Sequence, residues 1–246
     1  MVTTPTSSTE SERPAPIAAV WHTIVFILIF PGLGIWQLFH FQTFHVNSRI
    51  ALYGTSIAIE WVSFCYIWLL GLRPTGTRLR DVISGRWAKF QDLIKDIGVA
   101  FVFWLIAAGV LVALRSGLGP NPDELRAMKI LAPQNTTEII MWISLSLTAG
   151  FCEEFMFRGY LQRQIFAWTG SAPTAAVLQG IVFGFGHLYQ GWKGVITISI
   201  YGMLFGALAI VRKSLRPGMI QHAAQDSITG ILIYALIRHG YGKLLG

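Results

Sequence analysis

Long apolar runs recur along the chain, and they constrain its fold more than any other feature. A helix needs about 20 apolar residues to cross a bilayer. Runs near this length are separated by polar or Pro- and Gly-containing segments. The sequence therefore predicts an all-α fold, a polytopic transmembrane helical bundle of about seven spans. We place these spans near residues 17–39, 50–71, 97–114, 139–157, 172–188, 195–211 and 219–237.

Charge content agrees with a membrane protein and excludes other classes. Only 13% of the residues are charged, about half of the share of roughly 25% in soluble domains. A soluble or disordered chain with so few charges is not expected. The net charge of +7 fits basic loops that are held at an anionic membrane face. We therefore expect the lipid bilayer as a partner and no nucleic acid.

Loop composition divides the chain further. Residues 1–16 are rich in Thr, Ser and Pro and predict a disordered tail, and 239–246 form a second tail. The basic loop 72–95 is placed in the cytoplasm by the positive-inside rule, and 115–137 predicts a short interfacial helix. The two cysteines form no CxxC pair and are expected to be small, buried apolar residues.

Charged and ionisable groups inside the apolar spans are the strongest functional signal. Such groups cost about 2.5–3.5 kcal/mol on insertion scales, so they are rare and mark sites by default. All but one of those found here lie at or after residue 153, within the helices of 138–238. They are Glu60, Glu153, Glu154, Arg158, His187, His222 and Asp226.

Glu154 and Arg158 are four residues apart, with the acid first, which is the better orientation for a helical ion pair. Glu153 then points about 100° away and faces another helix. His222 and Asp226 are also four residues apart and share one helix face. The alternatives are that these are solvated helix ends, and that His187 is only a structural hydrogen bonder.

Helix lengths indicate which groups meet. A turn at 170–171 places Glu153 and His187 at similar depth on antiparallel helices, because the two legs have nearly equal length. The depth of His222 stays open. Histidines and carboxylates in one membrane cavity suggest water that is activated by a divalent metal, with zinc as the expected ion. A glutamate that is not needed as a ligand then acts as general base.

The sequence patterns Glu153-Glu154-x-x-x-Arg158, Phe183-x-x-x-His187 and His222-x-x-x-Asp226 occur in this order on successive apolar helices. Together they resemble the three motifs of the CPBP family, which includes the CAAX prenyl endopeptidases and the bacteriocin-processing and immunity proteins. The motifs cover 153–226, so 138–238 resembles the catalytic helices. Residues 17–137 resemble the family only in being hydrophobic helices and loops.

The resemblance implies an intramembrane metalloendopeptidase that cuts membrane-associated proteins or peptides, including prenylated CAAX-type substrates, in the plasma membrane of a bacterium. Its implied catalytic residues are Glu153, Glu154, Arg158, His187, His222 and Asp226. Its implied metal ligands are Glu153, His187, His222 and Asp226. The family often has Asn at the last position. An ionised Asp226 cannot donate a hydrogen bond to an oxyanion. Asp226 is therefore either protonated in its buried site, or it binds a metal or orients His222, and we favour metal binding.

The sequence is also consistent with other functions. One is a non-catalytic membrane scaffold, or a bacteriocin-immunity-type protein that binds a partner. Another is an ion transporter, since intramembrane Glu and His also serve ion pathways, although no inverted repeat is visible. Glu60 lies outside the motifs, and we expect an internal ion pair or hydrogen bond for it, or else a place on the substrate path.

Overall fold

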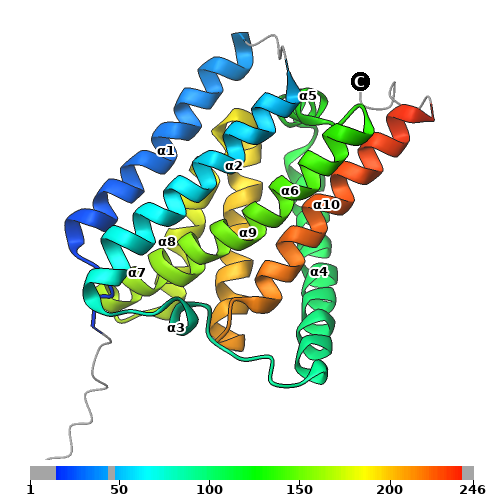
Figure 1. The fold of residues 1–246 in the computed structure, drawn as a ribbon. Helices are drawn as coiled ribbons and strands as arrows, with labels where there is room; N and C mark the ends of the chain where they lie inside the picture. Colours follow the sequence, from blue (N-terminus) through cyan, green and yellow to red (C-terminus); the bar gives the residue numbers. More distant parts are fainter. Residues whose placement is uncertain (1–14, 44–47, 240–246) are drawn as a thin grey trace, which may run out of the picture.

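The computed structural model describes residues 15–43 and 48–239, and these residues form helices and no β-strand (Figure 1). The all-α prediction is therefore confirmed. The two predicted tails lie almost entirely outside the described residues. The elements in chain order are α1 (Val20–Thr43), α2 (Arg49–Cys65), η1 (Tyr66–Leu72), η2 (Arg73–Thr75), α3 (Leu79–Ile83), α4 (Phe90–Leu118), α5 (Pro122–Leu131), α6 (Thr136–Glu153), η3 (Glu154–Leu161), α7 (Gln162–Thr169), α8 (Ala172–Phe185), η4 (Leu188–Gln190), α9 (Gly191–Arg212) and α10 (Arg216–Arg238).

All of the predicted spans coincide with helices. Within the described residues, 5 helical segments are long and apolar enough to cross a membrane by length and composition. They comprise α1, α2 with its extension, α4, the continuous helix from α6 to α7, and η4 with α9. Helix α8 is a shorter apolar helix. The multi-pass membrane character is supported, and the number of seven spans stays a prediction.

Capping residues set the helix boundaries near the site. Gly170 ends α7 in the left-handed conformation with φ of 69°, and the Ser171 side chain accepts from Thr174 N at 3.3 Å to start α8. The predicted turn at 170–171 is therefore present. Asn121, followed by Pro122, caps α5, which is the predicted short helix between 115 and 137. Asn135 caps α6 by accepting from Glu138 N at 2.9 Å.

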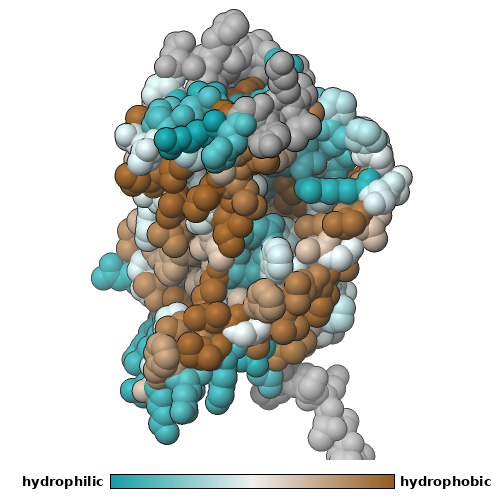
Figure 2. Space-filling view, turned by 90° about the vertical axis from the view of Figure 1, so that its right-hand side faces the viewer, coloured by the Kyte–Doolittle hydropathy of each residue, from teal (hydrophilic) through white to brown (hydrophobic). Residues whose placement is uncertain are grey.

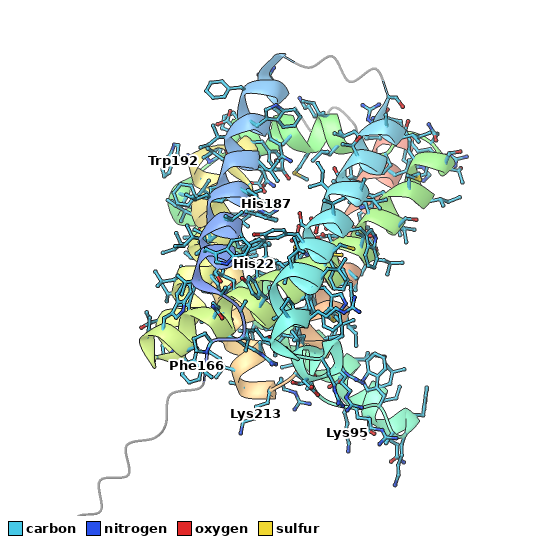
Figure 3. The ribbon with its side chains drawn as sticks, turned by 60° about the vertical axis from the view of Figure 1, so that its left-hand side comes forward. His22, Lys95, Phe166, His187, Trp192 and Lys213 are labelled. Atoms are coloured by element: carbon cyan, nitrogen blue, oxygen red, sulfur yellow. The ribbon has the colours of Figure 1, made fainter. Side chains whose placement is uncertain are left out.

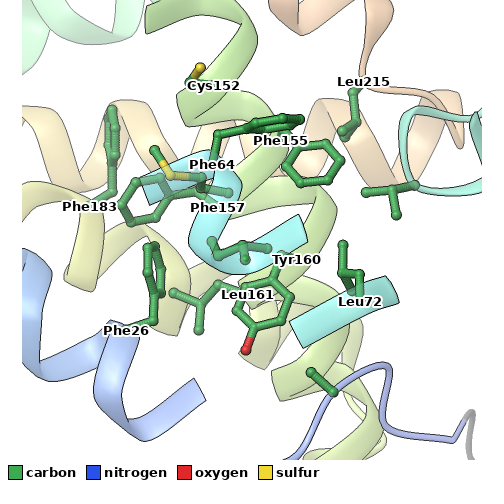
Figure 4. Packing of buried hydrophobic residues seen from close by; sticks show 14 of the residues in the cluster. Phe26, Phe64, Leu72, Cys152, Phe155, Phe157, Tyr160, Leu161, Phe183 and Leu215 are labelled. Carbon is green, nitrogen blue, oxygen red and sulfur yellow. The ribbon is translucent and has the colours of Figure 1, made fainter. Parts of the chain in front are cut away.

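The main core lies around η3, a π-helical stretch in the middle of the long helix that α6 begins. Phe155, Phe157 and Tyr160 are fully buried there, and they pack with Phe26 of α1 and Phe64 of α2 (Figure 4). A π-helical turn inserts an extra residue into the helix and is frequent at functional sites. The most buried packing in the molecule therefore directly follows Glu153.

Apolar side chains on the outer helix faces stay exposed, as expected for lipid contact. Leu28, Val112 and Val211 are 67%, 65% and 78% exposed. Cys152 is buried as predicted, but Cys65 is exposed, so that expectation is wrong for Cys65. In a bilayer-spanning helix an apolar position can face lipid as readily as the core, so hydrophobicity alone does not predict burial there.

Helices α8 and α9 pack closely because glycine lines their contact. A Cβ on Gly184 would lie 2.6 Å from the Val195 carbonyl oxygen, and one on Gly180 would lie 2.8 Å from Met203 N. Contacts this short require glycine. Gly180 and Gly184 therefore form a small-residue face toward α9, which fixes the position of the end of α8 shortly before His187.

Candidate active site

Glu154 and Arg158 form a buried ion pair inside η3. Arg158 Nη1 lies 3.0 Å from Glu154 Oε1, and the two side chains are 0% and 1% exposed. The guanidinium also lies 4.5 Å from the Phe183 ring centre and 4.9 Å from that of Phe205, and it donates to the Gly202 carbonyl at 3.1 Å. Cation–π contacts and a hydrogen bond to a carbonyl thus stabilise this buried charge. The predicted pair is confirmed in the structure.

His222 of α10 joins both glutamates. Its Nδ1 lies 3.1 Å from Glu154 Oε1, which is a hydrogen bond. Its Nε2 lies 3.5 Å from Glu153 Oε2 and 3.6 Å from Asp226 Oδ2, distances too long for good hydrogen bonds. Helix α10 approaches this closely because it faces Gly150 of α6, where a Cβ would lie 2.8 Å from Ala223 N. The depth of His222, left open by the sequence, therefore matches that of Glu153.

His187 lies in the short turn between α8, which ends at Phe185, and η4, which begins at Leu188. Its Nδ1 lies 3.0 Å from the carbonyl oxygen of Phe183, so Nδ1 donates and Nε2 carries the lone pair. The Phe183 ring contacts both histidines, and its centre lies 4.9 Å from the ring centre of His187 and 6.3 Å from that of His222. In Figure 3, His187 lies between the level of Trp192 and that of Lys95 and Lys213, in the middle of the bundle.

Two cavities meet at these side chains. The first, which we call the α2 cavity, has a volume of about 200 Å³ and is lined by Gln37, Ser56, Glu60 and Glu153. The second, which we call the α10 cavity, has a volume of about 330 Å³ and is lined by Glu124, Tyr201, His222 and Gln225. Among the described residues, the side chains that line both are Leu131, Trp142, His187, Tyr189 and Asp226.

The surface supports this arrangement. Figure 2 shows hydrophilic residues at the floor of a hollow between hydrophobic walls, on the side of the molecule where α4 and α10 lie. A polar floor between apolar walls is typical of a binding site. His187 and Asp226, which belong to both cavities, therefore mark the point where a bound molecule would reach from one cavity into the other.

Glu60 of α2 joins the site, which the motifs did not indicate. Glu60 lines the α2 cavity together with Glu153, and its carboxyl lies beside the Glu153 carboxyl. Its Oε2 is buried and has no hydrogen-bond partner among the described residues. This position agrees with a place on the substrate path, and the internal ion pair or hydrogen bond stays a prediction. A lone carboxylate in an apolar span was the only sequence signal for this residue.

The histidine and carboxylate side chains of the site are of the kinds that bind a metal ion, but the structure brings too few of them close together. Both His187 and His222 use Nδ1 in a hydrogen bond and direct Nε2 elsewhere, the usual state of a metal-binding histidine. In the part of the chain that the structure describes, however, no group of three or more His, Cys, Asp or Glu side chains is arranged to hold a metal ion. The metal set Glu153, His187, His222 and Asp226 stays a prediction.

Residues 135–228 match the model of a protein family described as type II CAAX prenyl endopeptidase, Rce1-like. The chain carries an Rce1-like segment. The match supports the family resemblance predicted from the three motifs, and its range contains every predicted catalytic residue. No curated protein and no solved structure matches the chain.

The Rce1-like segment begins at the N-cap of α6 and ends within α10. The described family is one of endopeptidases, hydrolases that cut peptide bonds. Helices α1, α2 and α4 lie outside the match, so Glu60 and nearly half of the residues that line the α2 cavity come from another part of the chain. The catalytic roles of the individual side chains stay predictions.

Proposed function

We propose that the protein is an intramembrane endopeptidase in which Glu153 activates the attacking water. The observation that carries this proposal is the position of Glu153. Its side chain is 11% exposed and lines the α2 cavity with His187 and Asp226. Its Oε2 lies 3.5 Å from His222 Nε2. A buried carboxylate that faces imidazole nitrogens at a cavity floor is suited to hold and deprotonate one water.

The proposed reaction needs only side chains and water. Glu153 takes a proton from the water while the oxygen attacks the peptide carbonyl carbon, and the carbonyl oxygen gains the negative charge. Glu153 then gives the proton to the leaving nitrogen as the C–N bond breaks. Protons and electrons balance, because the carboxyl is restored and one water is consumed for each bond cut.

The surrounding groups keep Glu153 and His222 in place. Arg158 neutralises Glu154, and Glu154 accepts from His222 Nδ1, so the imidazole presents Nε2 to the cavity. This chain of contacts resembles the way that a carboxylate orients a catalytic histidine in other hydrolases. Glu154 and Arg158 are therefore proposed as positioning residues. Should a divalent cation bind at the predicted ligands, it would polarise the carbonyl and lower the pKa of bound water.

The substrate class follows from the cavity walls. The α2 cavity is lined by apolar side chains of α1 and α2, including Phe30, Leu33, Leu52 and Ile59, on helices that are apolar enough to lie in a bilayer. Such walls favour apolar or lipid-modified segments over charged ones. Prenylated CAAX-type proteins are consequently the first substrates to test, and the bacterial plasma membrane stays the predicted location.

The test is peptide hydrolysis by protein purified into lipid nanodiscs. The probe is an internally quenched peptide that ends in a farnesylated Cys-Val-Ile-Met sequence, compared with the same peptide without the farnesyl group. We expect the Glu153→Gln variant to lose at least about 10²-fold in kcat, since general bases contribute roughly 10²–10⁴-fold. Glu138→Gln, an isosteric change near the start of the same helix, is the control and should keep activity.

The outcomes separate the candidate functions. Cleavage by the wild type and the control, together with loss in Glu153→Gln, supports the proposal. Equal cleavage by all three proteins contradicts the role of Glu153. If neither peptide is cut by the wild type, the proposal of a CAAX-type protease is wrong, and a scaffold or immunity-type role takes its place.

A further inference from the structure

A third cavity, which we call the basal cavity, lies between α7, α8, α9 and the segments that precede α4 and α10. Its volume is about 380 Å³. Phe166 and Lys213 line it, and Figure 3 shows both at the end of the bundle where Lys95 also lies. Among the described residues, those that line the basal cavity line neither the α2 cavity nor the α10 cavity. The basal cavity is therefore separate from the candidate active site.

Basic side chains prevail at this end of the molecule. Residues 73–96 contain six Lys or Arg and three Asp, and residues 212–216 contain three Lys or Arg and no acidic residue. The basal cavity has the same bias, because Arg158, Arg163 and Lys213 line it and no carboxylate of the described residues does. The positive-inside rule places this end in the cytoplasm, where the membrane leaflet is rich in anionic lipids.

The positive charge of Arg163 is oriented but not neutralised. Its Nη1 donates to the Asp81 carbonyl at 2.9 Å, and its Nη2 donates to the Val82 carbonyl at 2.7 Å and to Ser84 Oγ at 3.1 Å. These acceptors carry no formal charge. The nearby Asp81 carboxylate is 59% exposed and lies 3.7 Å from Arg80 Nε. A bound anion can therefore neutralise Arg163, whereas Arg158 is already paired with Glu154.

Lys213 adds a second cation at the rim of the cavity. Unlike its neighbour Arg212, which lies 3.3 Å from Asp96, it forms no ion pair with a described residue. It ends α9 with a φ of +49°. In the part of the chain that the structure describes, the other non-glycine residue with positive φ is Ser84, which lines the same cavity. Such unfavourable conformations cluster at functional sites, including ligand-binding ones.

Hydrogen bonds hold the rim in place. Leu215 N donates to the Ile83 carbonyl at 2.9 Å. Ser214 Oγ and Arg216 Nε both donate to the Ser84 carbonyl, at 3.3 and 3.1 Å. The turn between α9 and α10 is thus joined to the segment between α3 and α4. Ligand sites are usually preformed in this way.

The rest of the cavity wall is apolar, and apolar side chains continue along the outer face of α9. Phe166 and Leu215 line the cavity. Ile210 and Val211, which directly precede the basic end of α9, are 36% and 78% exposed. On a helix that crosses a bilayer, such side chains contact lipid acyl chains. A ligand with both a phosphate group and acyl chains matches this arrangement better than a free anion does.

We propose that the basal cavity binds an anionic phospholipid. Arg163 and Lys213 contact its phosphate group, and Ile210 and Val211 contact an acyl chain. Basic pockets between membrane helices on the cytoplasmic side bind anionic headgroups in other proteins. The inference does not depend on the proposed peptide hydrolysis, because the cavity lies apart from Glu153 and the groups around it.

The test is native mass spectrometry of the full chain in detergent micelles, titrated with dioleoyl phosphatidylglycerol or dioleoyl phosphatidylcholine. The two lipids have the same acyl chains and differ in net charge. We expect phosphatidylglycerol to bind about 25-fold more tightly than phosphatidylcholine, since each of the two cations contributes about fivefold. Equal Kd values for the two lipids would overturn the inference.

Two variants and a control assign the binding to the cavity. Lys213→Gln removes an exposed cation and should raise the Kd for phosphatidylglycerol about fivefold. Lys95→Gln is the matched control, because Lys95 is exposed at the same end of the bundle and lines none of the three cavities. Its Kd should stay within about twofold of the wild type, since exposed distant charges are screened. Ala209→Leu fills the basal cavity without a change of charge and should abolish the preference for phosphatidylglycerol.

Equal losses of affinity in Lys213→Gln and Lys95→Gln would indicate diffuse attraction to the basic surface and would overturn the assignment to the cavity. Unchanged binding by a folded Ala209→Leu variant would overturn it as well. Excess inorganic phosphate should leave phosphatidylglycerol bound, and full displacement would show that the site recognises a free anion and no lipid. These titrations contain no peptide, so their failure leaves the proposed hydrolysis untouched.

Discussion

The buried ion pair between Arg158 and Glu154 makes a quantitative prediction about stability. Arg158→Met removes the cation and leaves a carboxylate that is 1% exposed. Breaking a buried pair from one side typically costs about 3–5 kcal/mol. Because His222 Nδ1 still donates to Glu154 at 3.1 Å, we expect a cost near the lower end, about 3 kcal/mol.

Removal of both charges should cost much less. Replacement of a buried pair by apolar or neutral groups of similar volume is often close to neutral. Arg158→Met combined with Glu154→Gln is therefore expected to be more stable than Arg158→Met alone by about 2 kcal/mol. The exposed pair Arg115–Glu124 is the matched control. Arg115 is 55% exposed, so Arg115→Met should cost between about 0 and 1 kcal/mol.

The assay is reversible unfolding in mixed micelles with increasing denaturing detergent, followed by tryptophan fluorescence. It gives the free energy of unfolding of each variant. Equal losses of unfolding free energy in Arg158→Met and Arg115→Met would contradict the prediction. A double variant that is less stable than Arg158→Met would also contradict it, because Glu154 would then not carry an uncompensated charge in the single variant.

Three other changes are expected to give clear results. Gly184→Ala should destabilise by about 1–3 kcal/mol through overpacking against α9, whereas Gly109→Ala, with nothing within 4 Å, should not destabilise; equal melting temperatures for these two variants would contradict this. Elemental analysis should find about one zinc per chain, lost in both His187→Ala and His222→Ala, and a metal-free wild type with full activity would exclude the metal prediction. Glu60→Gln should lower kcat and shift its pH profile, since Glu60 contacts Glu153, and an unchanged profile would assign Glu60 a purely structural role.

Local patterns predicted much of the site. The four-residue spacing of Glu154 and Arg158 predicted an ion pair within one helix, and the turn at 170–171 followed from Gly and Ser at adjacent positions. Such inferences succeed because helix geometry relates sequence spacing directly to distance. The placement of His187 and Glu153 along one cavity followed from the same arithmetic.

Contacts between helices were not predictable to the same extent. The hydrogen bond from His222 to Glu154 and the approach of Glu60 to Glu153 depend on how α10 and α2 are rotated and staggered against α6. That register follows from packing at Gly150 and at other positions distant in sequence. The π-helical turn of η3 also rotates the side chains that follow it relative to those before it. A sequence pattern with a period of 3.6 residues does not predict this rotation.

The residues that line the α2 cavity come from two parts of the chain, and this has a consequence for how the sequence can change. The carboxylates and histidines that we propose as catalytic come from one continuous Rce1-like stretch, whereas part of the α2 cavity wall is contributed by α1 and α2 outside it. Selection can therefore act on the two parts separately. Mutations in the first two helices would then change which molecules the α2 cavity accepts and leave the proposed catalytic groups in place.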